Sequence, residues 1–174
     1  KKDVAPENNK GIYLVPQIMT NNTEQFRDMG EKMADLGYKE VNINLGCPSR
    51  TVVTKKKGSG FLAYPEELNN FLDEIFWYCK DMEISLKTRI GMENPEEFVR
   101  LMEIYNKYPL KELIVHPRLQ IDYYNNHPNM EAFAYAVEKS KAPLCYNGDL
   151  FSVEDIRNFQ EEYPTIENIM LGRG

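Results

Sequence analysis

Residues 41–48 read Val-Asn-Ile-Asn-Leu-Gly-Cys-Pro, a stretch that predicts a buried strand ending at a turn with one cysteine. Its apolar residues alternate with two asparagines, which is the period-two pattern of a β-strand. Glycine and proline then flank Cys47, and both residues end regular structure. Because an α/β barrel carries its chemistry at the carboxyl ends of its strands, Cys47 is the first candidate for a functional residue. A free cysteine is often only a small buried hydrophobe, and that interpretation stands beside it.

Strand and helix patterns alternate along the chain on both sides of this stretch. Apolar runs typical of strands occupy six segments: 12–18, 41–45, 83–88, 113–116, 144–146 and 169–171. The five segments with helical spacing that connect them are 23–36, 65–75, 94–105, 130–137 and one that begins after Ser152. Asp155 stands three residues after Ser152, in a variant of the capping box that starts a helix. Regular alternation of this kind predicts a parallel sheet with right-handed crossovers.

A doubly wound sheet and a barrel both satisfy this alternation. Polar or special residues follow nearly every strand: Gln17, Asn44, Cys47, Lys87, Arg89, His116, Arg118, Asn147, Asp149 and Arg173. Contributions from every strand favour a barrel, because a doubly wound sheet concentrates its site at one switch point. We therefore predict an α/β fold, a TIM (β/α)8 barrel of which six strands are present. Two strands of such a barrel would be missing from this chain.

Composition and charge exclude several classes of protein. The chain has 174 residues, 42% of them hydrophobic and 28% charged, which suits one soluble domain. No apolar run approaches the ~20 residues of a membrane span. The net charge of −6 argues against nucleic acid as a partner, although the basic run 55–57, with Arg50 nearby, argues for it. A solvated loop would explain that run equally well.

The three cysteines are far apart, and none belongs to a C-x-x-C pair. Neither a zinc site nor a disulfide framework is therefore indicated, and reduced thiols in the cytoplasm are the simplest account. We expect no metal. The chain opens on Lys1 rather than Met and stops directly after an apolar run, so we expect it to be a piece of a longer protein.

Two glycine turns close the last two predicted strands, at 147–149 (Asn-Gly-Asp) and 172–174 (Gly-Arg-Gly). Glycine there lets backbone N–H groups approach an anion closely. Barrels often hold a phosphate at the loops after their last two strands. The pair of turns therefore predicts a phosphorylated ligand, although Asn-Gly-Asp alone is also a common turn.

Five motifs, in this order and with this spacing, resemble those of the tRNA-dihydrouridine synthases, flavin enzymes with a TIM-barrel catalytic domain. They are Val-Pro-Gln at 15–17, Asn-Ile-Asn-Leu-Gly-Cys-Pro at 42–48, Ser-Leu-Lys-Thr-Arg-Ile-Gly at 85–91, Val-His-Pro-Arg at 115–118, and the pair of glycine turns. The resemblance covers essentially the whole chain. It implies that the six strands are barrel strands three to eight. The first strands would lie upstream of residue 1, and a helical tRNA-binding domain would lie downstream of residue 174.

The resemblance implies FMN as cofactor and NADPH as reductant. Lys87 would sit against the N1/O2 edge of the flavin, where a fixed cation stabilises the anionic reduced ring. Gln17 and His116 would hydrogen-bond the isoalloxazine, although His116 taken alone would more simply be a satisfied core histidine. The residues implied to hold the FMN phosphate are Asn147, Gly148, Asp149, Gly172 and Arg173.

The implied reaction is the reduction of uridine to 5,6-dihydrouridine in tRNA. Reduced FMN would deliver hydride to C6 of a flipped-out uracil, and Cys47 would give a proton to C5. Thiols are mostly protonated at neutral pH, which suits an acid rather than a nucleophile. The residues implied to contact the uracil, its phosphates or the surrounding RNA are Asn44, Arg89, Arg118 and Lys56, with Lys57 as an alternative to Lys56. We expect the full-length form to be monomeric, with no membrane partner.

Some positions depart from the family pattern. Pro117 replaces a small residue, which stiffens the turn before Arg118, and Leu119 stands where the family often has Thr.

Three other functions compete with the synthase. An FMN-dependent barrel reductase of a small pyrimidine or enone would share the Asn and Cys at a strand end. A flavin-free RNA-binding scaffold would leave Lys87 idle, and a phosphosugar isomerase would need a carboxylate base, for which Asp149 is the candidate.

Overall fold

A six-stranded parallel sheet forms the centre of the computed structural model, which describes residues 3–172. The strands are β1 (Gln17–Ile18), β2 (Glu40–Leu45), β3 (Glu83–Arg89), β4 (Leu113–His116), β5 (Leu144–Tyr146) and β6 (Asn168–Ile169). They lie in the order β1-β2-β3-β4-β5-β6, each parallel to the next. A doubly wound sheet reverses its strand order at the switch point, and this sheet does not. The consecutive order confirms the prediction of a partial α/β barrel.

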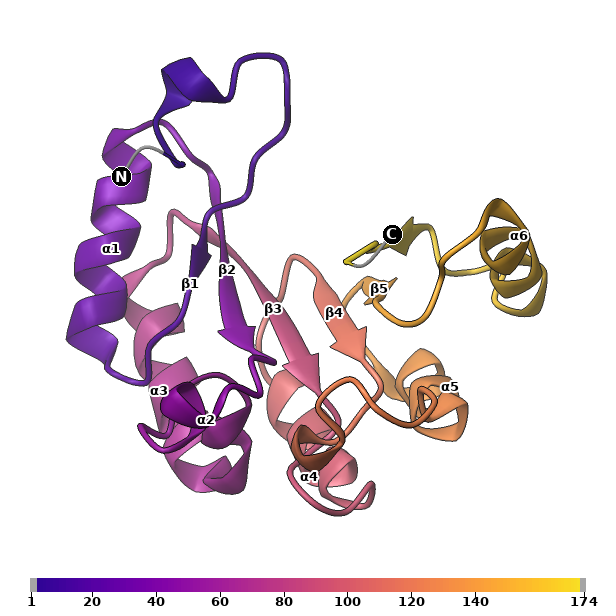
Figure 1. The fold of residues 1–174 in the computed structure, drawn as a ribbon. Helices are drawn as coiled ribbons and strands as arrows, with labels where there is room; N and C mark the ends of the chain where they lie inside the picture. The colour runs from indigo at the N-terminus through magenta and orange to yellow at the C-terminus, as the bar shows by residue number, and fades with distance from the viewer. Residues whose placement is uncertain (1–2, 173–174) are drawn as a thin grey trace.

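Helices connect the strands and lie on the outer side of the curved sheet (Figure 1). They are α1 (Thr23–Asp35), α2 (Arg50–Val53), α3 (Pro65–Tyr78), α4 (Glu97–Tyr105), α5 (Met130–Lys139) and α6 (Val153–Glu162). Short 3-10 helices are η1 (Pro6–Asn8), η2 (Gly58–Ala63) and η3 (Gln120–Asp122). The five longer helices are the predicted ones, whereas α2 and the 3-10 helices were not predicted. No helix within residues 3–172 has the length and apolar character needed to cross a membrane.

The predicted strand boundaries hold in the centre of the sheet and are wrong at its edges. The expected strand over 12–18 is reduced to β1, and Ile12 and Tyr13 are exposed instead of paired. The expected strand over 169–171 becomes β6, which ends at Ile169. An edge strand has a partner on one side only, so its ends gain less from the ladder than a central strand does. The apolar run that begins at Ile12 therefore did not predict where β1 pairs with its neighbour.

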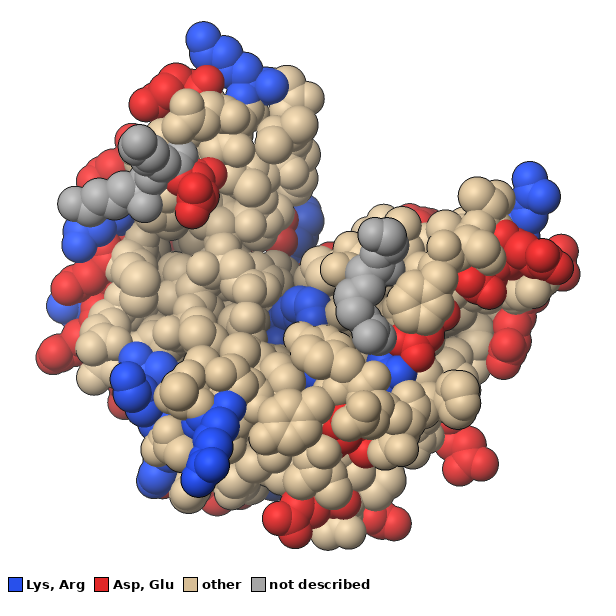
Figure 2. Space-filling model, in the orientation of Figure 1, with Lys and Arg blue, Asp and Glu red and all other residues tan. Residues whose placement is uncertain are grey.

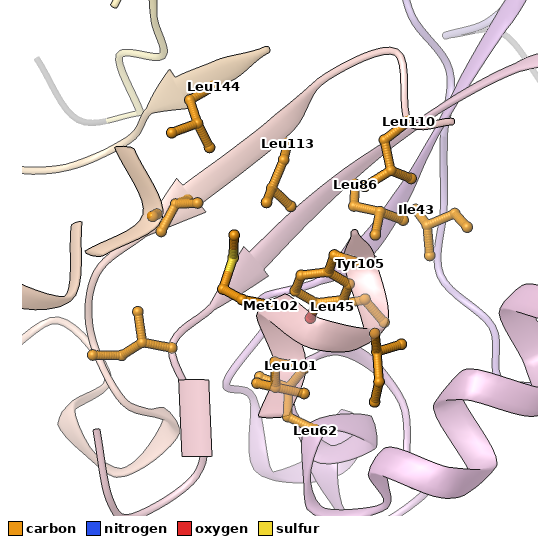
Figure 3. Packing of buried hydrophobic residues seen from close by; sticks show 14 of the residues in the cluster. Ile43, Leu45, Leu62, Leu86, Leu101, Met102, Tyr105, Leu110, Leu113 and Leu144 are labelled. Carbon is orange, nitrogen blue, oxygen red and sulfur yellow. The ribbon is translucent and has the colours of Figure 1, made fainter. Parts of the chain in front are cut away.

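The main core lies between the outer face of the sheet and the helices. Ile43 and Leu86 are paired in register and fully buried on this face. Figure 3 shows Met102 and Tyr105 of α4 close to the leucines of the neighbouring strands. In β2 the alternate positions face the inside of the curve and are polar, among them Asn42, which hydrogen-bonds across strands. The period-two pattern of β2 thus separates a packing face from a chemical face.

Local capping sets where the helices begin. The Ser152 hydroxyl accepts from the Asp155 backbone N–H, and the Asp155 carboxylate accepts from the Ser152 N–H, which confirms the predicted capping box. Asn22 caps α1 through the N–H of Gln25, and Asn129 caps α5 in the same way. Because all the strands are parallel, their carboxyl ends lie on the same side of the molecule.

Candidate functional site

A cavity of about 420 Å³ opens at the carboxyl ends of the strands. In Figure 2 the molecule is hollowed between the half that carries α1 and the half that carries α6, with Lys or Arg atoms at the floor of the hollow. The cavity is lined by Gln17, Asn44, Gly46, Cys47, Lys87, Arg89, His116, Tyr124, Asn147, Gly148, Asp149, Met170 and Gly172. Two larger cavities, of about 610 and 660 Å³, are lined by none of the predicted site residues.

The cavity therefore gathers most of the predicted site from strands far apart in sequence. Arg118 does not line it, although Arg118 contacts two residues that do. Lys56 lies elsewhere, with its ammonium 3.9 Å from the centre of the Tyr64 ring and 3.4 Å from a Glu67 carboxylate oxygen. Arg173 lies outside the described residues. The cavity also includes Tyr124 and Met170, which sequence reasoning missed.

The turn that carries Cys47 is held from both sides. The Cys47 N–H donates to Asn44 Oδ1 at 2.9 Å, and the Cys47 carbonyl accepts from the N–H and hydroxyl of Ser59 at 3.0 and 2.9 Å. Gly58 has φ +54°, and a Cβ there would lie 2.8 Å from the Cys47 carbonyl oxygen. Sequence reasoning missed Gly58 and Ser59. The Gly-Ser-Gly run directly after the lysines was the available signal for a close backbone approach.

Side-chain amides on the inner face form a chain of hydrogen bonds with one fixed direction. Asn44 Oδ1 accepts two backbone N–H groups of the turn, so Asn44 Nδ2 must be the donor to Gln17 Oε1, at 2.7 Å. Gln17 Nε2 then donates to Asn42 Oδ1 at 2.8 Å, and Asn42 Nδ2 donates to the Ser85 hydroxyl at 3.0 Å. The turn of the cysteine thereby orients Gln17 at the edge of the cavity.

Lys87 supplies a positive charge to the cavity. Burial first, and then the nearby Arg89 charge, lower the pKa of Lys87 to about 8. Among the residues that the structure describes, no carboxylate lies within 4 Å of its ammonium. A half-buried cation without an acidic partner is well placed to hold an anionic group of a ligand.

Arg89 connects the cysteine turn to the loop after β4. Its side chain is 1% exposed, and it donates to the carbonyls of Gly46, Leu119 and Tyr123 at 2.9, 2.7 and 2.5 Å. Burial is the first cause that lowers the pKa of Arg89, and the Arg118 charge contributes. These bonds position two loops against each other. The predicted contact between Arg89 and a substrate stays a prediction.

Arg118 is also fully engaged with the protein. Its five guanidinium N–H groups donate to the carbonyls of Asn125 and Asn126, to both carboxylate oxygens of Asp149, and to Nε2 of His116. A direct substrate contact, which we predicted for Arg118, would require one of these bonds to break. The negative Asp149 carboxylate would repel a phosphate. Asp149 could therefore bind a phosphate only through its backbone, or assist binding by positioning Arg118.

His116 lies 7% exposed beside the cavity. Burial first, and then the charges of Arg89, Lys87 and Arg118, lower the pKa of His116 to about 3. The imidazole is therefore neutral at physiological pH. Its ring centre lies 6.3 Å from that of Tyr124, in the same loop that the two arginines hold.

The two glycine turns contribute differently to the cavity. A Cβ at Gly148 would lie 1.9 Å from the Tyr146 hydroxyl, so the Tyr146 ring by itself requires glycine there. Gly172 has space around it, since a Cβ there would meet only the Asn147 amide at 3.8 Å. Asn147 joins the two turns, because its Nδ2 donates to the Met170 carbonyl at 2.8 Å. Across residues 3–172, no group of His, Cys, Asp and Glu side chains is arranged to hold a metal ion.

A curved parallel sheet with a polar cavity at its strand ends is the architecture of a barrel enzyme. The family model described as dihydrouridine synthase (Dus) matches residues 1–174. The chain belongs to the dihydrouridine synthase family.

Two curated relatives are tRNA-dihydrouridine synthases. The tRNA-dihydrouridine(16) synthase of Pseudomonas syringae pv. tomato is 30% identical, over 94% of this chain and 52% of the relative. The tRNA-dihydrouridine synthase B of Vibrio parahaemolyticus is 26% identical, over 99% of this chain and 53% of the relative. The chain thus spans about half the length of these relatives. A solved structure of a variant of NCR from Zymomonas mobilis is similar with a TM-score of 0.48 and 12% identity, over 93% of this chain and 55% of that one.

Proposed function

We propose that this chain carries the catalytic site of a flavin-dependent oxidoreductase that reduces uridine to 5,6-dihydrouridine in tRNA. The observation that carries the proposal is the single cavity in which Cys47 meets Lys87, His116 and Gln17. Membership of the dihydrouridine synthase family and the names of the relatives support it.

The residues around the cavity fit FMN by the chemistry of their donors. Lys87 has no acidic partner among the described residues and suits the electron-rich edge of a flavin ring. Gln17 and the neutral His116 would hydrogen-bond the ring. The phosphate would be held by Asn147, Gly148 and Gly172, with backbone N–H groups of the 147–149 turn, and by Arg173. The volume of about 420 Å³ is within the usual range for a small-molecule site.

The chain's own part in the reaction is proton transfer and positioning. When bound and reduced by NADPH, FMN would supply the hydride that adds to C6 of the uracil. Cys47 would donate its thiol proton to C5 and recover a proton from water afterwards. Asn44 and Ser59 hold the Cys47 backbone, so the thiol would be presented from a fixed turn.

The substrate would be tRNA. The full-length protein would act on it as a monomer in the cytoplasm. Arg50, Lys55 and Lys56 are exposed on the segment that follows Cys47. Figure 2 shows Lys and Arg atoms grouped on the surface beside α2 and α3. Exposed cations of this kind would contact phosphates without reading sequence. Asn44 would contact the base itself, and Arg89 and Arg118 would support the site from behind unless substrate binding frees their donors.

The test uses the full-length protein with NADPH and tRNA that lacks modification. Mass spectrometry would look for uridines that have gained two hydrogens. Cys47→Ala is the informative variant, and Cys79→Ala is its matched control because Cys79 does not line the cavity. We expect the gain in wild type and Cys79→Ala, and its loss by at least about 100-fold in Cys47→Ala.

Three outcomes would contradict the proposal, each in a different way. A yellow protein that oxidises NADPH but leaves tRNA unchanged would favour the reductase of a small pyrimidine or enone. A protein that binds no flavin at micromolar concentration would favour the RNA-binding scaffold. Equal activity in Cys47→Ala and wild type would remove Cys47 from the role of acid.

A further inference from the structure

The Arg118 guanidinium, 1% exposed, determines which nitrogen of His116 can carry a proton. Arg118 Nη1 lies 3.0 Å from His116 Nε2. A guanidinium has donors only, and it stays protonated in proteins. Nε2 of His116 must therefore be the acceptor, and the ring proton of the neutral imidazole must lie on Nδ1.

The arginine is itself prevented from turning away. Asp149 accepts from Nη1 and Nη2 at 2.9 and 2.5 Å, in the bidentate geometry that fixes a guanidinium plane. The carbonyls of Asn125 and Asn126 accept its two remaining N–H groups at 3.0 and 2.7 Å. With all five donors satisfied, rotation of Arg118 would break several bonds at once.

We propose that Arg118, fixed by Asp149, is a positioning residue that holds His116 as the neutral Nδ1–H tautomer, so that His116 offers one donor and no charge to the ligand of the cavity. The assignment of the tautomer rests on the geometry of Arg118 alone. The benefit to a bound flavin rests on the proposed function. Tautomer and cofactor binding are therefore measured separately.

A second proton on His116 would have to displace Arg118, because two cations would face each other at 3.0 Å. The other charged groups that face the imidazole are Lys87, Arg89 and Asp149. Three cations against one carboxylate oppose protonation, and so does burial. The arrangement leaves the imidazole, which lines the cavity together with Lys87, with Nδ1 as its one ring donor.

The experiment is a ¹H–¹⁵N spectrum of the histidine rings in the full-length protein without added ligand. His116→Gln identifies the His116 signals, and His127→Gln identifies those of the exposed histidine in the loop after β4. We expect a proton on Nδ1 of His116, none on Nε2, and no titration down to pH 5. A wild-type spectrum with the proton on Nε2 would overturn the proposal without any further variant.

Two substitutions test the part played by Arg118. In Arg118→Gln the side-chain amide can donate or accept, so we expect both tautomers of His116 in the spectrum. In Arg118→Lys the ammonium can only donate, so we expect the Nδ1–H tautomer to remain. A His116 spectrum in Arg118→Gln identical to wild type contradicts the proposal. If Arg118→Gln does not fold, the spectra of wild type and Arg118→Lys test the proposal. Loss of the Nδ1–H tautomer in Arg118→Lys then contradicts it.

A titration of the same proteins with FMN, monitored by flavin fluorescence, tests the effect on cofactor binding separately from the tautomer of His116. We expect FMN affinity to fall about tenfold in Arg118→Gln and by less in Arg118→Lys. Wild type that binds no FMN would contradict the proposed function while leaving the tautomer assignment intact. Undiminished FMN affinity in Arg118→Gln, with a mixture of tautomers, would show that positioning of His116 does not serve the cofactor.

Discussion

Lys87 shows at the scale of one residue how a functional side chain opposes stability. Burial removes water from the Lys87 ammonium and so disfavours its charge, and the Arg89 guanidinium repels it. The pKa of Lys87 is about 8 in the folded protein against an ordinary value of 10.5. At neutral pH the residue is still charged, so the folded state carries the full cost of burying that charge.

We predict that Lys87→Met stabilises the protein without ligand at pH 7 by on the order of 2 kcal/mol and strongly weakens FMN binding. Between pH 8 and 10.5 the unfolded chain binds more protons at Lys87 than the folded chain, so wild-type stability rises with pH there. The difference between the two proteins should therefore shrink above pH 8. Urea unfolding at pH 7 and pH 10 measures it, and a less stable Lys87→Met at pH 7 would contradict the prediction.

Gly58 packs directly against the backbone of the turn that carries Cys47. A Cβ at Gly58 would approach the Cys47 carbonyl to 2.8 Å and the Cys47 Cβ to 3.0 Å. We predict that Gly58→Ala in the full-length protein lowers the proposed formation of dihydrouridine by about tenfold or more, since small displacements at a reacting group are costly.

Gly11→Ala is the matched control for Gly58→Ala. Gly11 also has a positive φ, +82°, but no atom lies within 4 Å of a Cβ built there. Both variants should lose about 1 kcal/mol from the left-handed backbone, and only Gly58→Ala should lose activity as well. Equal activity in the two variants would show that the cysteine turn tolerates the shift.

At the scale of elements, α4 is attached to β3 by a polar contact inside an apolar core. The Tyr105 and Thr88 hydroxyls lie 2.9 Å apart, and both side chains are fully buried. Thr88 donates its hydrogen to the Arg89 carbonyl at 2.8 Å, so Tyr105 is the donor of the shared bond. Burial strongly raises the pKa of Tyr105, which keeps the phenol neutral.

We predict that Tyr105→Phe costs about 1 kcal/mol of unfolding free energy, because Thr88 keeps its bond to the backbone and loses only a donor. Tyr78→Phe, on the exposed end of α3, should change stability by less than about 0.5 kcal/mol. Urea unfolding of both variants, made in the full-length protein, gives the comparison. A loss above about 3 kcal/mol in Tyr105→Phe would point to a packing change in place of one hydrogen bond.

At the scale of the whole molecule, the sheet is open in the part of the chain that the structure describes. β1 and β6 each pair on one side only, and the cavity of about 660 Å³ lies between residues of the β1 side, such as Tyr13, and of the β6 side, such as Asn168. Unpaired edges and an accessible interior face favour association with other chains.

We predict that the 174-residue chain expressed alone aggregates or unfolds without cooperativity. Light scattering and thermal unfolding across a range of protein concentrations would measure this. A soluble monomer with one cooperative transition that does not depend on concentration would contradict the prediction. It would show that the core between the sheet and the helices is enough to keep the chain folded.

Local sequence patterns determined the central strands, the five longer helices, the capping box at Ser152 and the set of polar residues at the strand ends. Each of these depends on residues close together in the chain, such as the alternation around Cys47. The edges were predicted less well, because pairing at Ile12 depends on a neighbouring strand and not on its own apolar character.

Only the tertiary structure decided what the polar residues at the strand ends do. Arg89 and Arg118 were predicted to contact a substrate, and the structure gives their donors to loop carbonyls, Asp149 and His116. Gly58 and Ser59 were not predicted to matter, yet Gly58 leaves room for the cysteine turn and Ser59 bonds the Cys47 carbonyl. The physical reason is that a hydrogen-bond donor takes whichever acceptor the fold brings within about 3 Å, and the sequence pattern does not show which acceptor that is.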